Sequence, residues 1–175
     1  HVHVVLVNQF GWSRKLIGNR LPRDMDIADL RRATDVEFGM AVYEPFGISP
    51  LEPLGSGAIC VISDACGCAG FALDVTHGHP TDNVIVADYT NLDVTPTIDQ
   101  LQNQGAELRD PIEHRVAEQI ADQLMQTLPA NDAAREKLIE SGQSMVAKMG
   151  WDQVVENRLL PMLERVMHAQ DTNEK

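Results

Sequence analysis

The sequence is poor in three things that define large classes of protein: cysteine, positive charge and long apolar runs. Only three of its 175 residues are cysteine, an odd and sparse set that favours reduced thiols and a cytoplasmic setting. Lysine and arginine number 14 against 26 acidic residues, and the net charge of -12 argues against nucleic acid or an anionic membrane as partner. No apolar run approaches the ~20 residues of a membrane span, and no signal peptide is visible.

The chain is long enough for one domain with a sizeable core. Its apolar content of 43% and charged content of 23% are ordinary for a globular protein, and the acidic balance is best explained by solubility. We expect one domain over residues 1–169 and a flexible polar tail over 170–175. Because the first residue is His1 and a strand-like run begins at once, we expect the chain to be a processed product or a fragment of a longer protein.

Apolar and β-branched runs predict strands that alternate with helices. Strands are expected over residues 1–7, 36–43, 58–63 and 83–88. Helices are expected over 24–33, from about 49, from 110, over about 132–148 and from 151 to about 169. In the helix from 110, apolar residues recur every four positions at Ile112, Val116, Ile120 and Leu124. Residues 8–22 and 64–71 are expected to be loops, and 89–109 receive no assignment. This alternation predicts an α/β fold with a Rossmann-like parallel sheet flanked by helices.

Residues 43–57 hold the most informative pattern. They read Tyr-Glu-Pro-Phe-Gly-Ile-Ser-Pro-Leu-Glu-Pro-Leu-Gly-Ser-Gly, with Glu44 and Glu52 eight positions apart. The segment from Ser49 to Glu52 has the form of a capping box, in which Glu52 would reach back to the start of a short helix. The amides around Gly47 would then be free to bind a phosphate.

Glu44 lies outside that helix, so capping does not explain it. It is either a solvated loop residue or an acceptor for the hydroxyl groups of a ligand. It follows a predicted parallel strand, and ligands bind at the carboxyl ends of such strands. Together with the Gly47 turn, this position favours the ligand role.

The pair Glu44 and Glu52 matches the E-x7-E motif of retaining glycosyltransferases of the GT-B fold, the group that contains glycogen and starch synthases. Residues 35–43 and 57–64 resemble the strands on either side of that motif. The helix that begins at Trp151 resembles the C-terminal helix of that fold, which crosses back towards the partner domain. The resemblance covers most of the chain and is specific around 35–64. It implies the C-terminal, donor-binding half of a GT-B enzyme.

The resemblance implies a role for each matching residue. Glu44 would contact sugar hydroxyls of a nucleotide diphosphate sugar and help to stabilise positive charge at the reacting carbon. The backbone of Phe46, Gly47 and Ile48 would face the sugar and diphosphate, and Glu52 would hold the ribose. The parent enzyme would transfer a hexosyl unit with retention, without a metal or cofactor. Such enzymes stabilise the leaving diphosphate with amides, the helix dipole and basic side chains.

The chain departs from that family pattern in three ways. A complete enzyme has an N-terminal acceptor domain, which this chain lacks, so we expect the chain alone to bind donor weakly and not to turn over. The Gly-Arg-Leu then Lys-Gly pattern that grips the diphosphate is absent, and no one member of the basic cluster is assigned that role. That cluster comprises Arg14, Lys15, Arg20 and Arg23. The usual Gly-Gly is replaced by Ala-Cys-Gly-Cys-Ala-Gly at 65–70, which only partly resembles the loop of eukaryotic-type glycogen synthases.

Other interpretations remain open. The domain could be a non-catalytic nucleotide-sugar or carbohydrate binding module, or part of a GT-B phosphorylase or epimerase. A metal-binding interaction domain is also conceivable, because Cys66, Cys68, His77 and His79 are zinc-ligand types, but the C-x-C spacing is tighter than usual and we expect no metal. A glycoside hydrolase fits less well, since one acid lies in a loop and the other in a helix start. Trp151 and the helical methionines (Met145, Met149, Met162, Met167) are expected to serve packing.

Overall fold

The computed structural model describes residues 2–7, 22–40, 44–90, 95, 97–103 and 105–173. Its centre is a parallel sheet of three strands in the order β1 (Val36–Gly39), β2 (Ile59–Ser63) and β3 (Val84–Ala87). In register, Phe38 lies opposite Val61, which lies opposite Ile85. The strands lie within three of the predicted ranges, although residues 41–43 of the first range fall outside the described part. The chain is therefore α/β, with a parallel sheet flanked by helices, as predicted.

The helices account for most of the remaining described chain. They are α2 (Ile27–Arg32), the 3-10 helix η1 (Ser49–Ser56), α3 (Gly67–Val75), α4 (Ile98–Gln102), α5 (Ala106–Thr127), α6 (Asp132–Met149), α7 (Trp151–Val154), the π-helical turn η2 (Val155–Leu159) and α8 (Leu160–Asn173). Gly150 is extended and separates α6 from α7. None of the helices in the described residues is long and apolar enough to cross a membrane.

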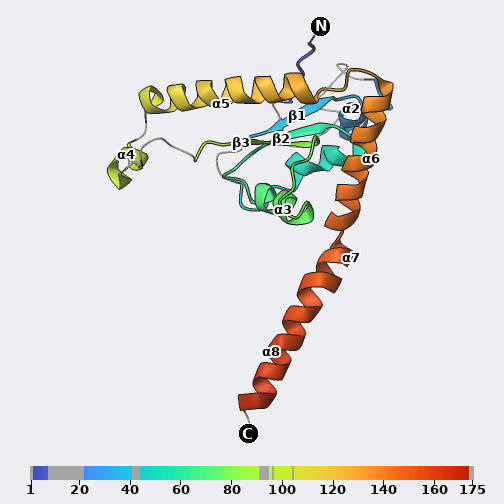
Figure 1. The fold of residues 1–175 in the computed structure, drawn as a ribbon, viewed down its shortest axis with the longest axis vertical. Coiled ribbons are helices and arrows are strands. Elements are labelled where there is room, and N and C mark those ends of the chain that lie inside the picture. The colour runs from blue at the N-terminus through green and yellow to red at the C-terminus, as the bar shows by residue number, and fades with distance from the viewer. Residues whose placement is uncertain are drawn as a thin grey trace.

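Strand β2 is buried along its whole length because helices cover both faces of the sheet. Its alternate residues Ile59 and Val61 pack with Val116 and Ile120 of α5, which runs across one face (Figure 1). This confirms the four-residue spacing of apolar side chains on which that helix was predicted. Successive side chains of a strand point to opposite faces, so the residues between them must face another layer.

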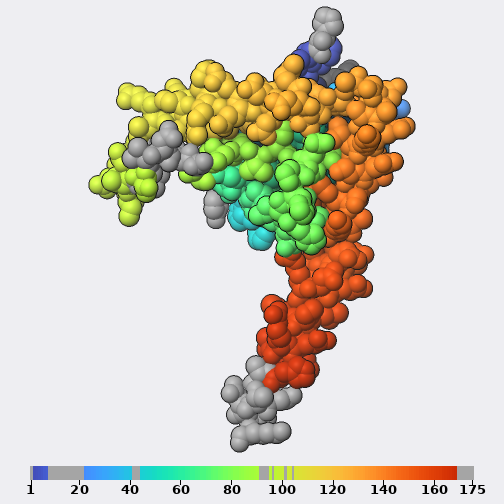
Figure 2. All heavy atoms as spheres, in the orientation of Figure 1, coloured from blue at the N-terminus to red at the C-terminus, as the bar shows by residue number. Residues whose placement is uncertain are grey.

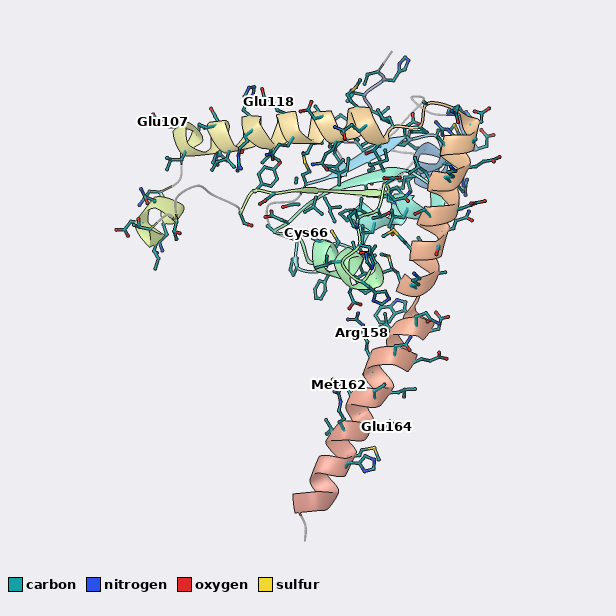
Figure 3. The ribbon with its side chains drawn as sticks, viewed as in Figure 1. Cys66, Glu107, Glu118, Arg158, Met162 and Glu164 are labelled. Atoms are coloured by element: carbon teal, nitrogen blue, oxygen red, sulfur yellow. The ribbon has the colours of Figure 1, made fainter. Side chains whose placement is uncertain are left out.

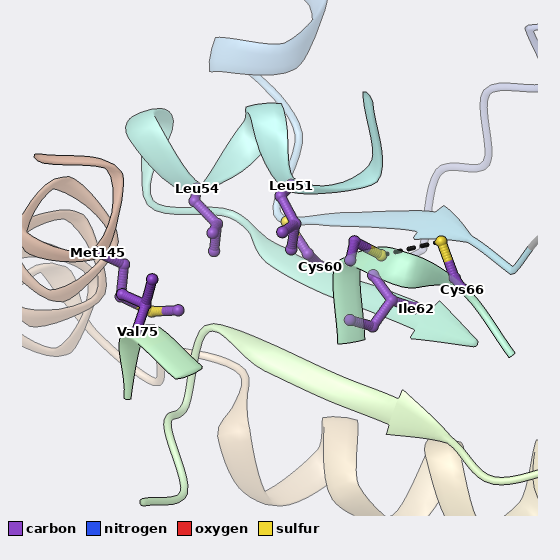
Figure 4. Close-up of a cluster of buried hydrophobic side chains, with 8 residues drawn as sticks. Leu51, Leu54, Cys60, Ile62, Cys66, Val75 and Met145 are labelled. Atoms are coloured by element: carbon purple, nitrogen blue, oxygen red, sulfur yellow. Dashed lines mark hydrogen bonds between the residues drawn. The ribbon is translucent and has the colours of Figure 1, made fainter. Parts of the chain in front are cut away.

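That second layer is formed by η1, α3 and α6. Cys60 and Ile62 of β2 contact a cluster that includes Leu51, Leu54 and Met145 (Figure 4). The close-up shows the cluster between η1, the sheet and α6, with the Cys66 thiol at one end. The core thus lies on both sides of a sheet whose middle strand contributes to both layers.

Two predictions about local structure are wrong. Residues 2–7 form no strand, and their apolar side chains lie in solvent, with Val2 90% and Leu6 84% exposed. A β-branched run becomes a strand only where another strand offers its edge. Residues 67–71, predicted as loop, belong to α3. Its residues Cys68, Ala72 and Val75 are spaced for one helix face and are buried together, and this packing outweighs the weak helix preference of the glycines.

Helices α7 and α8 form an arm that leaves the body of the domain (Figures 1 and 2). In the space-filling view the arm stands clear of the globular part along most of its length. Trp151 is 78% exposed, and Met162 and Met167 are exposed too, so the prediction that they serve packing is wrong for this domain. Met145, in contrast, is buried in the core as predicted.

Candidate functional site

The turn that contains Glu44 lies against the start of α3. The backbone of Glu44 forms a parallel bridge with Cys66, and its carbonyl oxygen accepts a 2.9 Å hydrogen bond from the Gly67 amide. Cys66 follows the end of β2, and Glu44 follows β1. Glu44 is therefore held at the carboxyl edge of the sheet, where ligands bind in parallel α/β folds.

Two glycines allow these backbone segments to touch. Gly47 has a φ of +61°, and a Cβ there would lie 2.2 Å from the Cys66 sulfur. A Cβ on Gly67 would lie 1.9 Å from the Pro45 carbonyl oxygen. Real Cβ atoms do not approach other atoms so closely, and the positive φ of Gly47 is a backbone conformation that favours glycine. The shape of the Glu44 turn therefore depends on both glycines and on the small helix start beneath it.

The side chain of Glu44 has a structural contact that the sequence did not reveal. The Gly47 amide donates a 3.2 Å hydrogen bond to Oε1 of Glu44. The expectation that this amide is free to bind a phosphate is therefore wrong: the carboxylate of the motif itself occupies it. Within the described residues, Oε2 of Glu44 accepts no hydrogen bond.

The predicted capping box is absent. Helix η1 begins at Ser49, in the expected place, but its cap position is Ile48, which has helical φ and ψ and makes no side-chain cap hydrogen bond. Ser49 and Glu52 instead both bind the guanidinium of Arg31. A cationic partner outcompetes the amide because a charge-assisted hydrogen bond is stronger than a neutral one. The capping explanation for Glu52 is thereby removed, and an ion pair with α2 takes its place.

Phe46 and Ile48 flank Gly47 and lie at the surface, 78% and 67% exposed. Phe38 of β1 is exposed too, but it is paired with Val61 and so lies on the α5 face of the sheet, opposite η1. The turn thus presents two apolar side chains in the same segment as the Glu44 carboxylate. Such a surface can contact a ligand that has both hydroxyl groups and apolar faces.

Arg31 is the residue of this region that the sequence did not indicate. Its guanidinium makes two hydrogen bonds to Glu37, of 3.0 Å from Nε and 2.8 Å from Nη2, and Nη1 donates to Glu52. The hydrogen bonds with Glu37 raise the pKa of Arg31, opposed by burial and assisted by Glu52, so the group stays charged. Its partners lie 6 and 21 positions away. No spacing pattern in the sequence predicts such a contact.

Asp64 is a second carboxylate at the same edge of the sheet that sequence analysis did not identify. It accepts 3.1 Å hydrogen bonds from the amides of Tyr89 and Thr90, and another from the Thr90 hydroxyl. Burial opposes ionisation, but these hydrogen bonds, led by that of Thr90, lower the pKa of Asp64 below its usual value. Asp64 thereby ties the ends of β2 and β3 together, and its hydrogen-bonding capacity is largely used for that purpose.

The two cysteines under the turn belong to the core. The Cys66 and Cys68 sulfurs lie 3.1 Å apart, and both side chains are buried (Figure 4). Burial, assisted by the hydrogen bond with Cys66, raises the pKa of Cys68 to about 12. His77 and His79 are exposed. Across the ranges that the structure describes, no three His, Cys, Asp or Glu side chains are grouped to hold a metal ion.

Of the predicted site residues, Glu44 and the 46–48 backbone lie in one turn against α3, whereas Glu52 lies on η1 and contacts Arg31 of α2. Arg14, Lys15 and Arg20, considered for the diphosphate, lie outside the described residues. No protein-family model matches the chain, and no curated protein matches it. The geometry offers one partly satisfied carboxylate, Glu44, at the carboxyl edge of a parallel sheet, where it can accept hydrogen bonds from ligand hydroxyls, and a second, Glu52, on η1.

Proposed function

We propose that this domain binds the nucleotide diphosphate sugar of a retaining, GT-B-type glycosyltransferase and forms the C-terminal half of that enzyme. The observation that carries the proposal is the position of Glu44. Its backbone is pinned to the start of α3, one carboxylate oxygen is oriented by the Gly47 amide, and the other has no hydrogen-bond partner among the described residues. A carboxylate fixed in this way is preorganised to accept sugar hydroxyls.

In this proposal the chain supplies fixed negative charge on the donor side of the reaction. Glu44 contacts hydroxyls of the transferred hexose and stabilises positive charge that develops at the anomeric carbon. Glu52 contacts the ribose, and the exposed turn at Phe46 and Ile48 lies beside the sugar. No metal or cofactor takes part. The basic groups that neutralise the diphosphate come from residues beyond those described and from the partner domain.

The arm supports the proposal that a second domain completes the enzyme. Its apolar side chains are exposed along α8 and the turn before it: Leu159, Leu160, Met162, Leu163, Val166 and Met167. A helix with such a face requires another surface to cover it. The N-terminal acceptor domain of the proposed enzyme is that surface. The three cysteines of the chain are free thiols, which supports a cytoplasmic setting.

The experiment compares Glu44→Gln with Glu107→Gln in the full-length protein. Both variants remove one negative charge, but Glu107 lies at the far end of α5, distant from Cys66 and the turn (Figure 3). We expect Glu44→Gln to lower hexosyl transfer by at least about 100-fold, the usual scale for losing one electrostatic group that acts in the transition state. Glu107→Gln should leave transfer unchanged.

A non-catalytic sugar-nucleotide binding module is the alternative class. It predicts that the full-length protein binds donor but transfers no hexose, with or without Glu44. Unchanged transfer in Glu44→Gln would remove Glu44 from the mechanism. Thermal unfolding of both variants checks that a loss of activity does not reflect loss of the turn, since Glu44 also accepts a hydrogen bond from Gly47.

A further inference from the structure

Arg31 connects three elements of the domain: α2, β1 and η1. It lies in the last turn of α2, and its side chain is only 18% exposed. Besides its bonds to Glu37 on β1, it reaches Glu52 on η1 and both the hydroxyl and the carbonyl oxygen of Ser49, at 3.1 Å and 3.4 Å. Each of its three guanidinium nitrogens thus donates to a group on β1 or η1.

The charge of Arg31 is already balanced without Glu52. The two hydrogen bonds from Nε and Nη2 to Glu37 form a bidentate pair, the strongest geometry for arginine and a carboxylate. Nη1 is then left to orient a second carboxylate, and it binds Oε2 of Glu52. The contact with Glu52 is therefore not needed to neutralise Arg31, and its effect is to hold the Glu52 carboxylate in one orientation.

Glu52 is held at one oxygen and open at the other. Its side chain is 52% exposed, and within the described residues nothing donates a hydrogen bond to Oε1. An exposed glutamate normally samples several rotamers, and fixing it costs side-chain entropy when a ligand binds. Arg31 removes much of that cost in advance by fixing the carboxylate before the ligand arrives.

The cluster also carries a net negative charge, because two carboxylates face one guanidinium. Such a cluster repels phosphate and attracts neutral hydrogen-bond donors. Two adjacent hydroxyl groups are the donor pattern that one carboxylate can accept together. The part of the ligand that fits here is therefore a vicinal diol, not the diphosphate.

We propose that Arg31 is a positioning residue that orients Glu52 to recognise the 2′- and 3′-hydroxyls of a ribose. This inference rests on the proposed function, because it assigns the ribose of the nucleotide to the Glu52 side of the turn. Arg31 itself does not touch the ligand. Its effect is on selectivity between ribose and sugars that lack the diol.

The test measures the affinity of the full-length protein for UDP, ADP and GDP and for their 2′,3′-dideoxy counterparts by calorimetric titration. We expect the wild type to bind one ribonucleotide about tenfold more tightly than its dideoxy form, the scale of one or two hydrogen bonds to a charged group. Arg31→Gln should bind the dideoxy form as the wild type does and lose most of that tenfold preference. Glu52→Gln should lose it as well.

Two further variants make the result specific. Arg31→Lys keeps the positive charge, but a single ammonium cannot bind Glu37 and Glu52 with the same fork, so it should fold and retain only part of the preference. Arg135→Gln removes an arginine that pairs with Asp35 elsewhere on the surface and should keep the full preference.

The outcomes separate the inference from the proposed function. If the wild type binds none of the nucleotides, both fail. If it binds and Arg31→Gln or Arg31→Lys discriminates as strongly as the wild type, the inference fails and the donor site stands. An equal loss of affinity for both forms in Arg31→Gln would show that Arg31 only maintains the fold, and this too overturns the inference.

Discussion

Strand β2 and helix α8 are both rich in apolar side chains, but they have opposite environments. Every residue of β2 is buried, between α5 on one face and η1 and α3 on the other. On α8, Leu163 is 45% exposed and Met167 65%. Strand β2 is complete in itself, because each of its apolar side chains finds partners within the described chain. The apolar side chains of the arm, in contrast, are exposed in this chain, and burying them requires another surface.

The largest difference between the two regions should appear when a leucine is shortened in each. Leu54 on η1 is fully buried, so Leu54→Ala should lower the free energy of unfolding by about 2–5 kcal/mol. Leu163→Ala on α8 should change it by less than about 0.5 kcal/mol in the same chain. Urea denaturation of both variants measures the difference. Equal losses would mean that α8 is packed against the domain and would contradict the arm.

A smaller effect is expected where the turn meets α3. Gly67→Ala places a Cβ against the Pro45 carbonyl and should destabilise the chain by about 1–3 kcal/mol, as overpacking does. Gly70→Ala in the same helix meets no atom within 4 Å and should stabilise it by about 0.5–1 kcal/mol, because alanine favours helix over glycine. Chemical denaturation of the pair provides the measurement. The same sign for both changes would show that the turn is not pressed against the helix start.

The buried thiol of Cys60 gives the stability of the sheet region a dependence on pH. Burial, assisted by the charge of Glu37, raises the pKa of Cys60 to about 12, against an ordinary value of 9.0. The folded state therefore holds its proton more tightly, and this contribution is complete below pH 9.0 and is lost as the pH rises towards 12. One such group changes stability by about 1.4 kcal/mol per pH unit within that window.

Replacing Cys60 with alanine isolates that contribution from other groups that titrate at high pH. Cys60→Ala should be less stable at pH 8 but should lose stability less steeply between pH 9 and pH 11 than the parent chain. Denaturation curves at several pH values give both slopes. Parallel slopes would mean that Cys60 ionises as freely in the folded chain as in the unfolded one.

The smallest effect is expected on the arm itself. The double change Leu160→Gln and Leu163→Gln should leave the stability of the isolated chain within about 0.5 kcal/mol of the parent, since both residues are already exposed. In the full-length protein the same change should be clearly destabilising, because it places two amides in the interface with the other domain. Thermal unfolding of both forms provides the comparison. No difference between them would leave the face of α8 without a partner in that protein.

The sequence predicted the elements whose signals are local and periodic. The strands around Val61 and Ile85 and the four-residue repeat of α5 were located correctly, because burial on both faces requires continuous apolar runs and α5 requires one apolar stripe. Residues 2–7 have an equally good strand pattern but form no strand. Strand formation depends on a neighbouring edge, and no run of residues encodes where that edge lies.

In the candidate site, too, local features were predictable from the sequence and long-range contacts were not. The position of Glu44 after β1 was predictable from the strand and the glycine turn. The contacts of its carboxylate were not, since Gly47 as hydrogen-bond donor depends on a left-handed turn packed against Cys66. Arg31 was missed because its bond to Glu52 joins residues 21 positions apart. Long-range ion pairs leave no periodic trace in a single sequence.

The most direct test of the account is a calorimetric titration of the full-length protein with a panel of UDP-, ADP- and GDP-sugars. The donor-site proposal predicts saturable binding of at least one member with one site per chain, and weaker binding of that same member by Glu52→Gln. Its affinity should fall by about tenfold, the scale of lost hydrogen bonds to a carboxylate. Absence of binding by every member of the panel would contradict the assignment of Glu44 and Glu52 to a donor site.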